Sequence, residues 1–178
     1  MKIHPLNAFT YCPKCGSQSF SVNDFRSKKC QSCGFTFYLN AASSVVAVIM
    51  NDNDEIIVTR RAFEPQKNTL DLPGGFVEFD ESAEDALRRE VHEELGIEIK
   101  NIEYLFSIPN VYPFGGLDVH TLDLVFLCKQ DGDSCIKPDD DVANAKYMKL
   151  SELEDSDFGL NSIRIAVRFL KNSAKVRK

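Results

Sequence analysis

The segment from Gly75 to Ile97, GFVEFDESAEDALRREVHEELGI, constrains this chain more than any other stretch, because it joins a glycine turn to an acidic helix. The expected helix runs from about Ser82 to Leu95, with Ser82 as its N-cap. Leu87, Val91 and Leu95 recur at intervals of four residues and would form an apolar stripe. The sequence therefore predicts a helix that packs on a core along one side.

The neighbouring side of this helix carries Glu90, Glu93 and Glu94, with small residues Ala83 and Ala86 beside them. Three carboxylates within little more than one turn repel one another, and the alanines leave room for an approaching group. A solvated acidic face is the commoner explanation of such a cluster. A bound divalent cation would explain both the repulsion and the open space.

The spacing of this segment resembles the signature of the Nudix hydrolases, a glycine and a glutamate followed by Arg-Glu-apolar-any-Glu-Glu-any-Gly-apolar. The matching positions are Gly75, Glu81, Arg89, Glu90, Val91, Glu93, Glu94, Gly96 and Ile97. The resemblance covers the chain from about Ala41 onward. It implies an α/β fold in which a mixed sheet lies between helices, the Nudix-type α/β/α sandwich.

The resemblance also implies a chemistry, the metal-dependent hydrolysis of a diphosphate linkage. Glu90, Glu93 and Glu94, with the Gly74 carbonyl, would bind catalytic Mg²⁺ or Mn²⁺ through hard oxygen ligands. Arg89 would orient a carboxylate, and Glu81 would steady the loop and helix. One carboxylate would accept a proton from the attacking water, but the sequence does not identify which glutamate is this base.

Four cysteines form two CxxC pairs that resemble the ligands of a zinc ribbon. Cys12 and Cys15 are separated from Cys30 and Cys33 by 14 residues, and a glycine follows each pair. We expect residues 1–40 to form this ribbon, since so short a module needs a metal to hold its fold. Four thiolates leave no open coordination position, so the expected Zn²⁺ is structural.

The ribbon segment also carries basic and aromatic residues, Phe25, Arg26, Lys28 and Lys29. They leave open a nucleic-acid-binding role for the ribbon, which we regard as the weaker alternative. The chain has a formal net charge of −6. Because residues 1–40 are net basic, residues 41–178 are more acidic still, which argues against broad nucleic-acid binding by the main domain.

The longest apolar run, Val45 to Met50, is too short to cross a membrane, and the N-terminus does not resemble a secretory signal. We therefore expect a soluble cytoplasmic protein, in which disulfides are disfavoured. The two further cysteines lack partners at metal-binding spacing. Cys128 is expected to be a buried small residue and Cys135 a loop residue.

Residues 41–178 are expected to form the Nudix domain. Ser44 to Met50 and Glu55 to Arg61 are predicted to form a β-hairpin, and Arg60 is a candidate substrate-binding residue. Two further strands are expected from Ile99 to Ile108 and from Val119 to Cys128. A last strand from Ala145 to Leu150 and a helix from about Leu160 to Leu170 complete the domain.

The predicted linker between two of these strands, Pro109 to Gly116, contains Tyr112 and Phe114. These aromatic residues are candidates for stacking on a base and for shaping the substrate site. An equally supported alternative is that they pin a turn to the core.

A zinc ribbon directly before a Nudix domain resembles the NADH pyrophosphatases, some of which remove NAD caps from RNA. The chain departs from their marker Ser-Gln-Pro-Trp-Pro-Phe, because it reads Ser-Ile-Pro-Asn-Val-Tyr-Pro-Phe from Ser107 to Phe114. A glutamate often found before their last sheet strand is Asn144 here, with Asp141 nearby. The candidate substrates are a dinucleotide such as NADH, ADP-ribose or another nucleoside diphosphate derivative. The resemblance also suggests a homodimer.

A rival hypothesis from another class is a non-catalytic sensor. In it, the Nudix domain binds a nucleotide and the ribbon contacts nucleic acid or a protein partner. The complete set of Glu90, Glu93 and Glu94 argues against this hypothesis, since a protein that only binds does not need all three.

Overall fold

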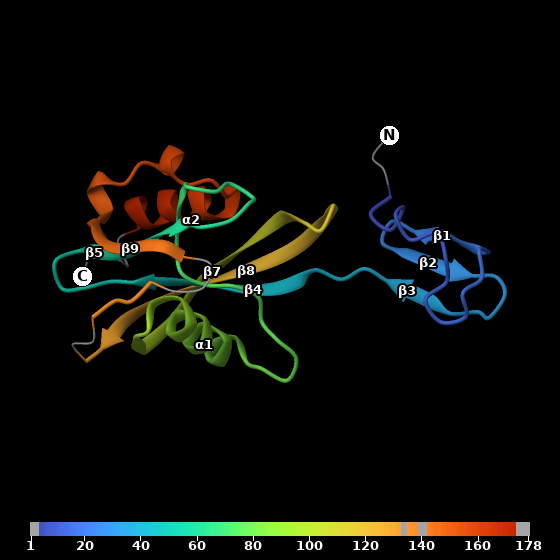
Figure 1. The fold of residues 1–178 in the computed structure, drawn as a ribbon, viewed down its shortest axis with the longest axis horizontal. Coiled ribbons are helices and arrows are strands. Elements are labelled where there is room, and N and C mark those ends of the chain that lie inside the picture. The colour runs from blue at the N-terminus through green and yellow to red at the C-terminus, as the bar shows by residue number, and fades with distance from the viewer. Residues whose placement is uncertain (1–3, 133–134, 139–141, 174–178) are drawn as a thin grey trace. The chain divides into compact units, whose positions relative to one another are not determined.

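A computed structural model describes residues 4–132, 135–138 and 142–173. The chain divides into two compact units, Met1–Ala41 and Ala42–Lys178 (Figure 1). Each unit has its own hydrophobic core.

The N-terminal unit is a small antiparallel sheet of three strands, β1 (Phe20–Asp24), β2 (Ser27–Cys30) and β3 (Thr36–Tyr38). In β1, Phe20 and Val22 alternate with polar residues, as is typical of a strand. The central strand, SKKC, was not expected, because its two lysines hide the apolar pattern. Lys28 is buried here, and its ammonium lies 5.0 Å from the centre of the Phe20 ring. Its aliphatic stem thus takes the place of an apolar side chain.

The second unit contains two sheets. In the first sheet, β8 (Leu117–Asp131) lies between β4 (Ala42–Ile49) and β7 (Glu98–Phe114). β4 runs parallel to β8 and β7 runs antiparallel to it, so this sheet is mixed. In the second sheet, β5 (Glu55–Arg61) pairs antiparallel with both β6 (Leu70–Asp71) and β9 (Val142–Lys149).

The predicted hairpin of β4 and β5 is wrong. The two strands are consecutive in the chain but belong to different sheets, and between them only Met50 and Ile56 form an isolated bridge. The reason lies in β4, whose inner residues are apolar on both faces. Such a strand is suited to the middle layer of a domain and pairs in parallel with β8, far away in the sequence.

Two helices cover the strands from opposite sides, α1 (Ala83–Leu95) and α2 (Asn161–Asn172), while short 3₁₀ helices occupy Leu150–Glu152 and Asp155–Asp157 (Figure 1). Alternate residues of β4 pack toward opposite helices, as the period of a strand requires. Val45 packs in the cluster that contains α1 residues, and Val46 packs in the cluster that contains α2 residues. The predicted α/β class with a mixed sheet between helices is therefore confirmed.

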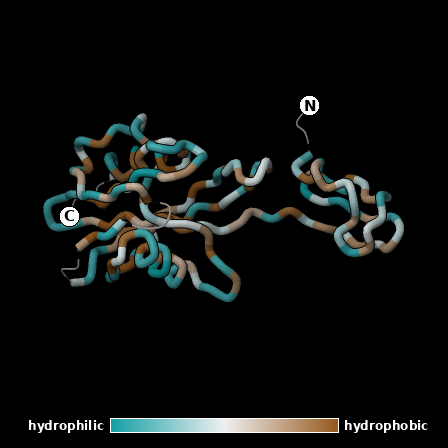
Figure 2. Tube along the Cα trace, viewed as in Figure 1, coloured by the Kyte–Doolittle hydropathy of each residue, from teal (hydrophilic) through white to brown (hydrophobic). Residues whose placement is uncertain are grey.

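Figure 2 shows that much of the hydrophobic sequence runs along the strands between the helices. Among the described residues, no helix combines the length and the apolar character needed to cross a membrane.

The predicted linker from Pro109 to Gly116 is mostly strand. β7 continues through Phe114 and β8 begins at Leu117, so that Gly115 and Gly116 alone form the turn of a long hairpin. Both glycines have positive φ, 58° and 77°, as a tight hairpin turn requires. Tyr112 and Phe114 are thus fixed in a ladder rather than carried on a loop.

Candidate active site

The acidic helix begins and ends where the sequence indicates. Ser82 is the N-cap, and its hydroxyl accepts a hydrogen bond from the Asp85 backbone N–H at 3.1 Å. At the other end Gly96 has φ 65°, and its N–H bonds to the His92 carbonyl. Leu87, Val91 and Leu95 are fully buried, and the neighbouring side of the helix, with Glu90 and Glu94, faces the glycine turn.

The Arg89 guanidinium contacts three carboxylates of this site. It forms two bonds to Glu81, from Nε to Oε1 at 2.9 Å and from Nη2 to Oε2 at 3.0 Å. Nη1 donates to Glu90 at 2.8 Å and to Glu93 at 2.9 Å, and Nη2 also donates to the Phe76 carbonyl. These contacts raise the pKa of Arg89 and lower that of Glu81. One guanidinium therefore links the glycine turn to the helix.

The glycine turn approaches the helix too closely for other residues. A Cβ on Gly75 would lie 2.5 Å from Oε1 of Glu90, and one on Gly74 would lie 2.0 Å from the Val45 carbonyl oxygen. Burial in this position raises the pKa of Glu90, while Arg89 opposes the shift. Glycine at both positions thus leaves the space that the Glu90 carboxylate and strand β4 occupy.

Two carbonyl groups of this turn accept hydrogen bonds from the backbone of β4, and the carbonyl between them does not. The carbonyl groups of Pro73 and Gly75 accept hydrogen bonds from Ala47 and Val45, at 2.8 and 2.9 Å. The Gly74 carbonyl between them has no such partner among the described residues. The Gly74 N–H donates to Oε2 of Glu94 at 3.2 Å. The site therefore combines acidic side chains with a backbone oxygen that accepts no hydrogen bond within the described part of the chain.

A cavity of about 340 Å³ opens beside this turn, between the two sheets. Gly74, Gly75 and Glu94 contribute to its wall from the acidic site. The remaining lining residues come from strands of both sheets, from the Leu72 and Phe76 positions and from the start of α2: Ser44, Val45, Val46, Thr59, Arg61, Asp71, Leu72, Phe76, Asn110, Tyr112, Phe114, Thr121, Asp123, Val142, Leu160, Ser162 and Ile163.

Aromatic side chains and one arginine form one part of this wall. The Tyr112 ring lies 6.1 Å from that of Phe76, edge to face, and 6.4 Å from that of Phe114, nearly parallel. Arg61 donates to the Tyr112 hydroxyl at 3.0 Å and forms an ion pair with Asp71 at 2.7 Å. The predicted Tyr112 and Phe114 are thus brought together beside the acidic site.

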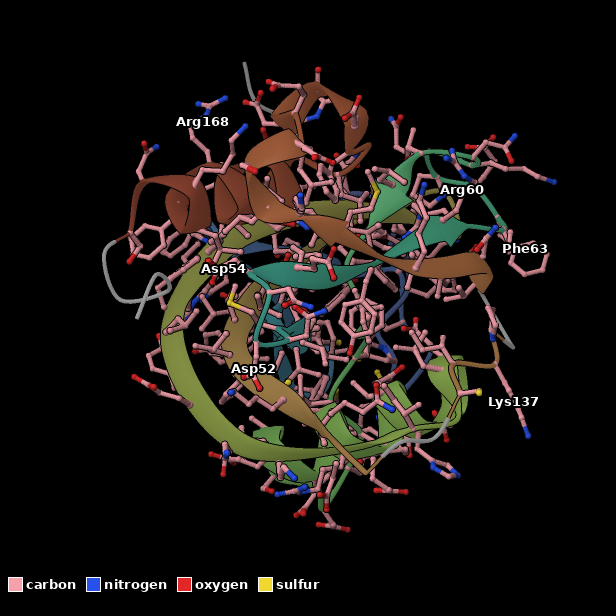
Figure 3. The ribbon with its side chains drawn as sticks, turned by 90° about the vertical axis from the view of Figure 1, so that its left-hand side faces the viewer. Asp52, Asp54, Arg60, Phe63, Lys137 and Arg168 are labelled. Carbon is pink, nitrogen blue, oxygen red and sulfur yellow. The ribbon has the colours of Figure 1, made fainter. Side chains whose placement is uncertain are left out.

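Arg60 is not brought to this cavity. It is exposed, it bonds to the Asn68 carbonyl, and its side chain lies at the periphery of the molecule (Figure 3). Because residues alternate along a strand, its neighbour Arg61 takes the inward position. Asp71, Asn110 and Asp123 also line the cavity but were not predicted from the sequence. The change from apolar to polar residues along one face of β7 and β8 could have indicated Asn110 and Asp123.

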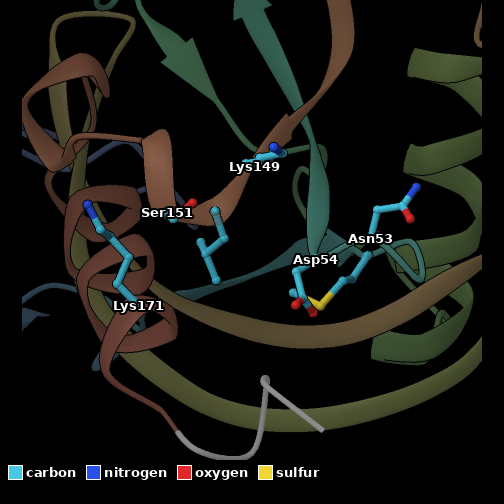
Figure 4. Close-up of a pocket in the computed structure, with 7 residues that line it drawn as sticks. Asn53, Asp54, Lys149, Ser151 and Lys171 are labelled. Carbon is cyan, nitrogen blue, oxygen red and sulfur yellow. The ribbon is translucent and has the colours of Figure 1, made fainter.

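A second cavity, of about 460 Å³, lies at the other end of the same unit (Figure 4). It is lined by Met50, Asn53, Asp54, Lys149, Leu150, Ser151 and Lys171. None of these residues belongs to the acidic helix or to the glycine turn. Its larger volume is therefore no reason to prefer it as the candidate active site.

The four ribbon cysteines converge as a metal site would require. Their Sγ atoms all lie within 4.8 Å of one another, with Cys12 to Cys33 at 3.8 Å and Cys15 to Cys30 at 3.7 Å. A tetrahedral zinc with Zn–S bonds of about 2.3 Å separates its sulfurs by about 3.8 Å. The Cys33 backbone N–H lowers the pKa of Cys30 to about 6, whereas the pKa of Cys15, despite the Ser17 backbone N–H, is raised to about 12 by its contacts with the other cysteines and by burial. The cluster fits a zinc ribbon.

The remaining cysteines lie as expected, since Cys128 is buried and Cys135 is exposed outside regular structure. Of the basic residues named for the ribbon, Arg26 and Lys29 are exposed and Lys28 is not. Lys28 is buried and donates to the Phe9 carbonyl at 2.5 Å, whereas Phe25 is 80% exposed beside the Arg26 guanidinium. Asn144, which stands where the resembling enzymes often have a glutamate, is exposed on β9, and Asp141 lies outside the described residues.

Comparison with known proteins agrees with the fold. A model of the NUDIX domain matches residues 41–167. The chain therefore belongs to the Nudix family.

Several relatives share one name, NAD-capped RNA hydrolase NudC. The protein from Pseudomonas putida is 31% identical over 159 residues, which cover 88% of this chain and 54% of that protein. The protein from Pseudomonas fluorescens is 34% identical over 145 residues, 80% of this chain and 49% of the relative. The chain thus spans about half the length of these relatives.

Solved structures show the same fold. A NUDIX hydrolase from Nitrosomonas europaea superposes with a TM-score of 0.72 at 19% identity and covers 94% of this chain, with 93% of its own chain matched. The NUDIX domain of Shewanella oneidensis NrtR, solved as a complex with ADP ribose, has a TM-score of 0.60 at 18% identity, covering 75% of this chain and 90% of its own.

Proposed function

We propose that this protein is a Nudix pyrophosphohydrolase that cleaves the diphosphate linkage of a nucleoside diphosphate derivative. The preferred substrates are a dinucleotide such as NADH, cleaved to two mononucleotides, and ADP-ribose. The observation that carries the proposal is the cluster of Glu81, Glu90 and Glu93 around Arg89, next to a glycine turn that lines a cavity with aromatic walls. Family membership and the names of the relatives point the same way.

Glu90, Glu93, Glu94 and the Gly74 carbonyl are the proposed ligands of Mg²⁺ or Mn²⁺. Carboxylate and carbonyl oxygens suit these hard cations, and the Gly74 carbonyl has no protein donor among the described residues. The two glycines beside the helix keep this set compact. When bound, the cation would neutralise charge on the phosphoryl oxygens and on the attacking water.

The protein side chains have separate tasks in this proposal. Arg89 holds the carboxylates of Glu90 and Glu93 in place, and Glu81 fixes Arg89. A glutamate of this set accepts a proton from the attacking water. The water oxygen forms a bond to phosphorus while the bond between phosphorus and the leaving phosphate oxygen breaks. Arg61, Tyr112 and Phe114 line the cavity that would hold the nucleoside.

We assign the ribbon cysteines Cys12, Cys15, Cys30 and Cys33 to one structural zinc ion. The proposed domains are residues 1–40 for the ribbon and residues 41–178 for the Nudix domain. A homodimer and a small-molecule nucleotide substrate are part of the proposal, whereas nucleic-acid binding by the ribbon remains the weaker alternative.

The test is hydrolysis of NADH, ADP-ribose and several sugar nucleotides with Mg²⁺ or Mn²⁺, followed by identification of the products. We expect two phosphate-containing products from the preferred substrate. Glu93→Gln and Glu94→Gln should reduce kcat at least about 100-fold, since each removes a charged ligand. Glu84→Gln, an exposed change on the same helix, is the matched control. Unchanged activity in both site variants would refute the metal assignment, and nucleotide binding without hydrolysis would favour the sensor.

A further inference from the structure

The inner end of the cavity carries a carboxylate that the proposed chemistry does not use. Asp123 on β8 is only 5% exposed and lines the cavity wall. Its partners are neutral: Ser44 and Thr121 donate to Oδ1 at 2.5 and 2.6 Å, and Asn110 donates to Oδ2 at 3.1 Å. The described residues form no salt bridge to Asp123.

A second buried carboxylate of the cavity wall, Asp71, shows the contrast. Asp71 is paired with Arg61 through Nη1, while Nε of Arg61 donates to the Pro65 carbonyl and Nη2 to the Tyr112 hydroxyl. Each nitrogen of this guanidinium thus has a partner other than Asp123, and among the described residues Asp123 forms no ion pair. A buried carboxylate without such a partner is costly, and a ligand that supplies further donors would lower that cost.

The polar groups around Asp123 result from a coordinated change along three neighbouring strands. On the inner face, Val46 of β4 is followed toward the cavity by Ser44, and Val125 of β8 by Asp123. On β7, Ile108 is followed in the same way by Asn110, but the register places Ile108 opposite Asp123 and Asn110 opposite Thr121. Because residues two apart share a face, polar residues begin at the level of Asp123 on β4 and β8 and at the level of Thr121 on β7. The cavity floor there is polar.

The hydrogen-bonding capacity of this floor is only partly used. An ionised carboxylate offers about four acceptor positions, and Asp123 uses three of them in the bonds above. The Asn110 amide gives one N–H to Asp123, while its carbonyl oxygen accepts no hydrogen bond from the described residues. Two acceptors on neighbouring side chains thus remain for a group that brings N–H donors.

The start of α2 contributes a third group to the same cavity. Ser162 is 2% exposed and lines the cavity, and among the described residues its hydroxyl has no hydrogen-bond partner. A buried hydroxyl without a partner costs about 1–3 kcal/mol. The Ser162 hydroxyl would donate a hydrogen bond to a ligand acceptor that lies next to the N–H groups of the same ligand.

We propose that Asp123 and Asn110, with Ser162, form a recognition subsite for a planar –NH₂ group that lies beside a hydrogen-bond acceptor on the substrate. The carboxamide of a nicotinamide and the amino edge of an adenine both have this chemistry. The subsite rests on the proposed hydrolysis of a nucleoside diphosphate derivative, and it names the part of the substrate that sets specificity.

The test compares kcat/KM for NAD⁺ with that for two analogues. Nicotinic acid adenine dinucleotide replaces the carboxamide by a carboxylate, and nicotinamide hypoxanthine dinucleotide replaces the adenine amino group by a carbonyl. We expect one analogue to be hydrolysed at least about 10-fold less efficiently, because Asp123 would then face an oxygen. The analogue that loses efficiency identifies which source of the –NH₂ group the subsite binds.

The variant Asp123→Asn sharpens the test, because its amide can donate to the oxygen of the analogue. We expect the preference for NAD⁺ over the affected analogue to fall at least about 10-fold. Asp118→Asn, an exposed change on the same strand, should keep the wild-type preference. Should Asp123→Asn fail to fold, as judged by its melting temperature, Asn110→Ala removes the neighbouring acceptor and should also weaken the preference.

The two proposals fail in different ways. If the wild-type protein hydrolyses all three dinucleotides within about twofold of one another, the subsite is refuted and the hydrolase stands. If it hydrolyses none, the proposed function fails, and calorimetry then tests the subsite by itself. Equal affinities for AMP and IMP, together with equal affinities for the mononucleotides of nicotinamide and nicotinic acid, would overturn it; a preference for the –NH₂ form would support it.

Discussion

Arg89 and Glu81 are joined by two hydrogen bonds, from Nε to Oε1 at 2.9 Å and from Nη2 to Oε2 at 3.0 Å. Glu81 also accepts a bond from the Glu78 backbone at 3.0 Å. The pair therefore connects the loop before the helix to the carboxylates on the helix. This two-bonded geometry is specific to a guanidinium, since an ammonium is a single point donor.

Replacement of Arg89 by lysine should separate charge from geometry. Arg89→Lys keeps the positive charge but loses the fork that contacts Glu81 and Glu90 together. We expect kcat to fall about 100-fold with a smaller effect on KM, because positioning rather than substrate binding is lost. The control is Arg88→Lys, in which a single bond to the Ile99 carbonyl can be kept. Equal kinetics in the two variants would contradict the positioning role.

The contact between Gly75 and Glu90 yields a second prediction. Gly75→Ala would place a methyl group 2.5 Å from Oε1 of Glu90, so the carboxylate must move. We expect a folded protein whose kcat drops about 10- to 100-fold. Gly132→Ala is a matched control, since its φ of 74° imposes strain of about 1 kcal/mol but no atom lies within 4 Å. Steady-state kinetics and thermal melting separate loss of activity from loss of stability.

Removal of the proposed zinc should affect one unit selectively. Structural zinc contributes about 10–16 kcal/mol of apparent binding energy, and the ribbon core contains little beyond Cys12, Cys30 and Phe20. We expect one zinc per chain by elemental analysis, and after chelation or in Cys30→Ser we expect proteolytic cleavage confined to residues 1–41. Residues 42–178 have their own cores and should stay protected. A zinc content of zero would leave the cysteine cluster unexplained.

Arg60 and Arg61 are adjacent on β5, and alanine variants of the two allow a matched comparison of the free energy of unfolding. Arg61→Ala would leave the buried Asp71 carboxylate without its partner and should lower the free energy of unfolding by about 3–5 kcal/mol. Arg60→Ala removes an exposed side chain and should change it by less than about 1 kcal/mol. Urea denaturation measures both values. Similar losses in the two variants would show that the ion pair with Asp71 is not what distinguishes them.

The local elements of the site could be predicted because their causes are local. Ser82 caps the helix within three residues of itself, Gly96 ends it, and the stripe of Leu87, Val91 and Leu95 needs only the helical period. The two cysteine pairs likewise carry their own spacing and turns, with φ of 72° at Gly16 and 74° at Gly34. Helix, caps and ribbon are therefore readable from the sequence.

The walls of the cavity depend on pairings between distant residues, which no local pattern reveals. Alternation places Arg60 and Arg61 on opposite faces of β5, but only the packing of this sheet against the first sheet decides which face meets the cavity. In the same way, Asp123 meets Ser44 because β8 lies parallel to β4, 79 residues away. The sequence by itself determined the acidic helix, its glycine turn and the cysteine cluster. Only the tertiary structure decided which arginine and which carboxylates face the cavity, because long-range strand pairing sets that choice.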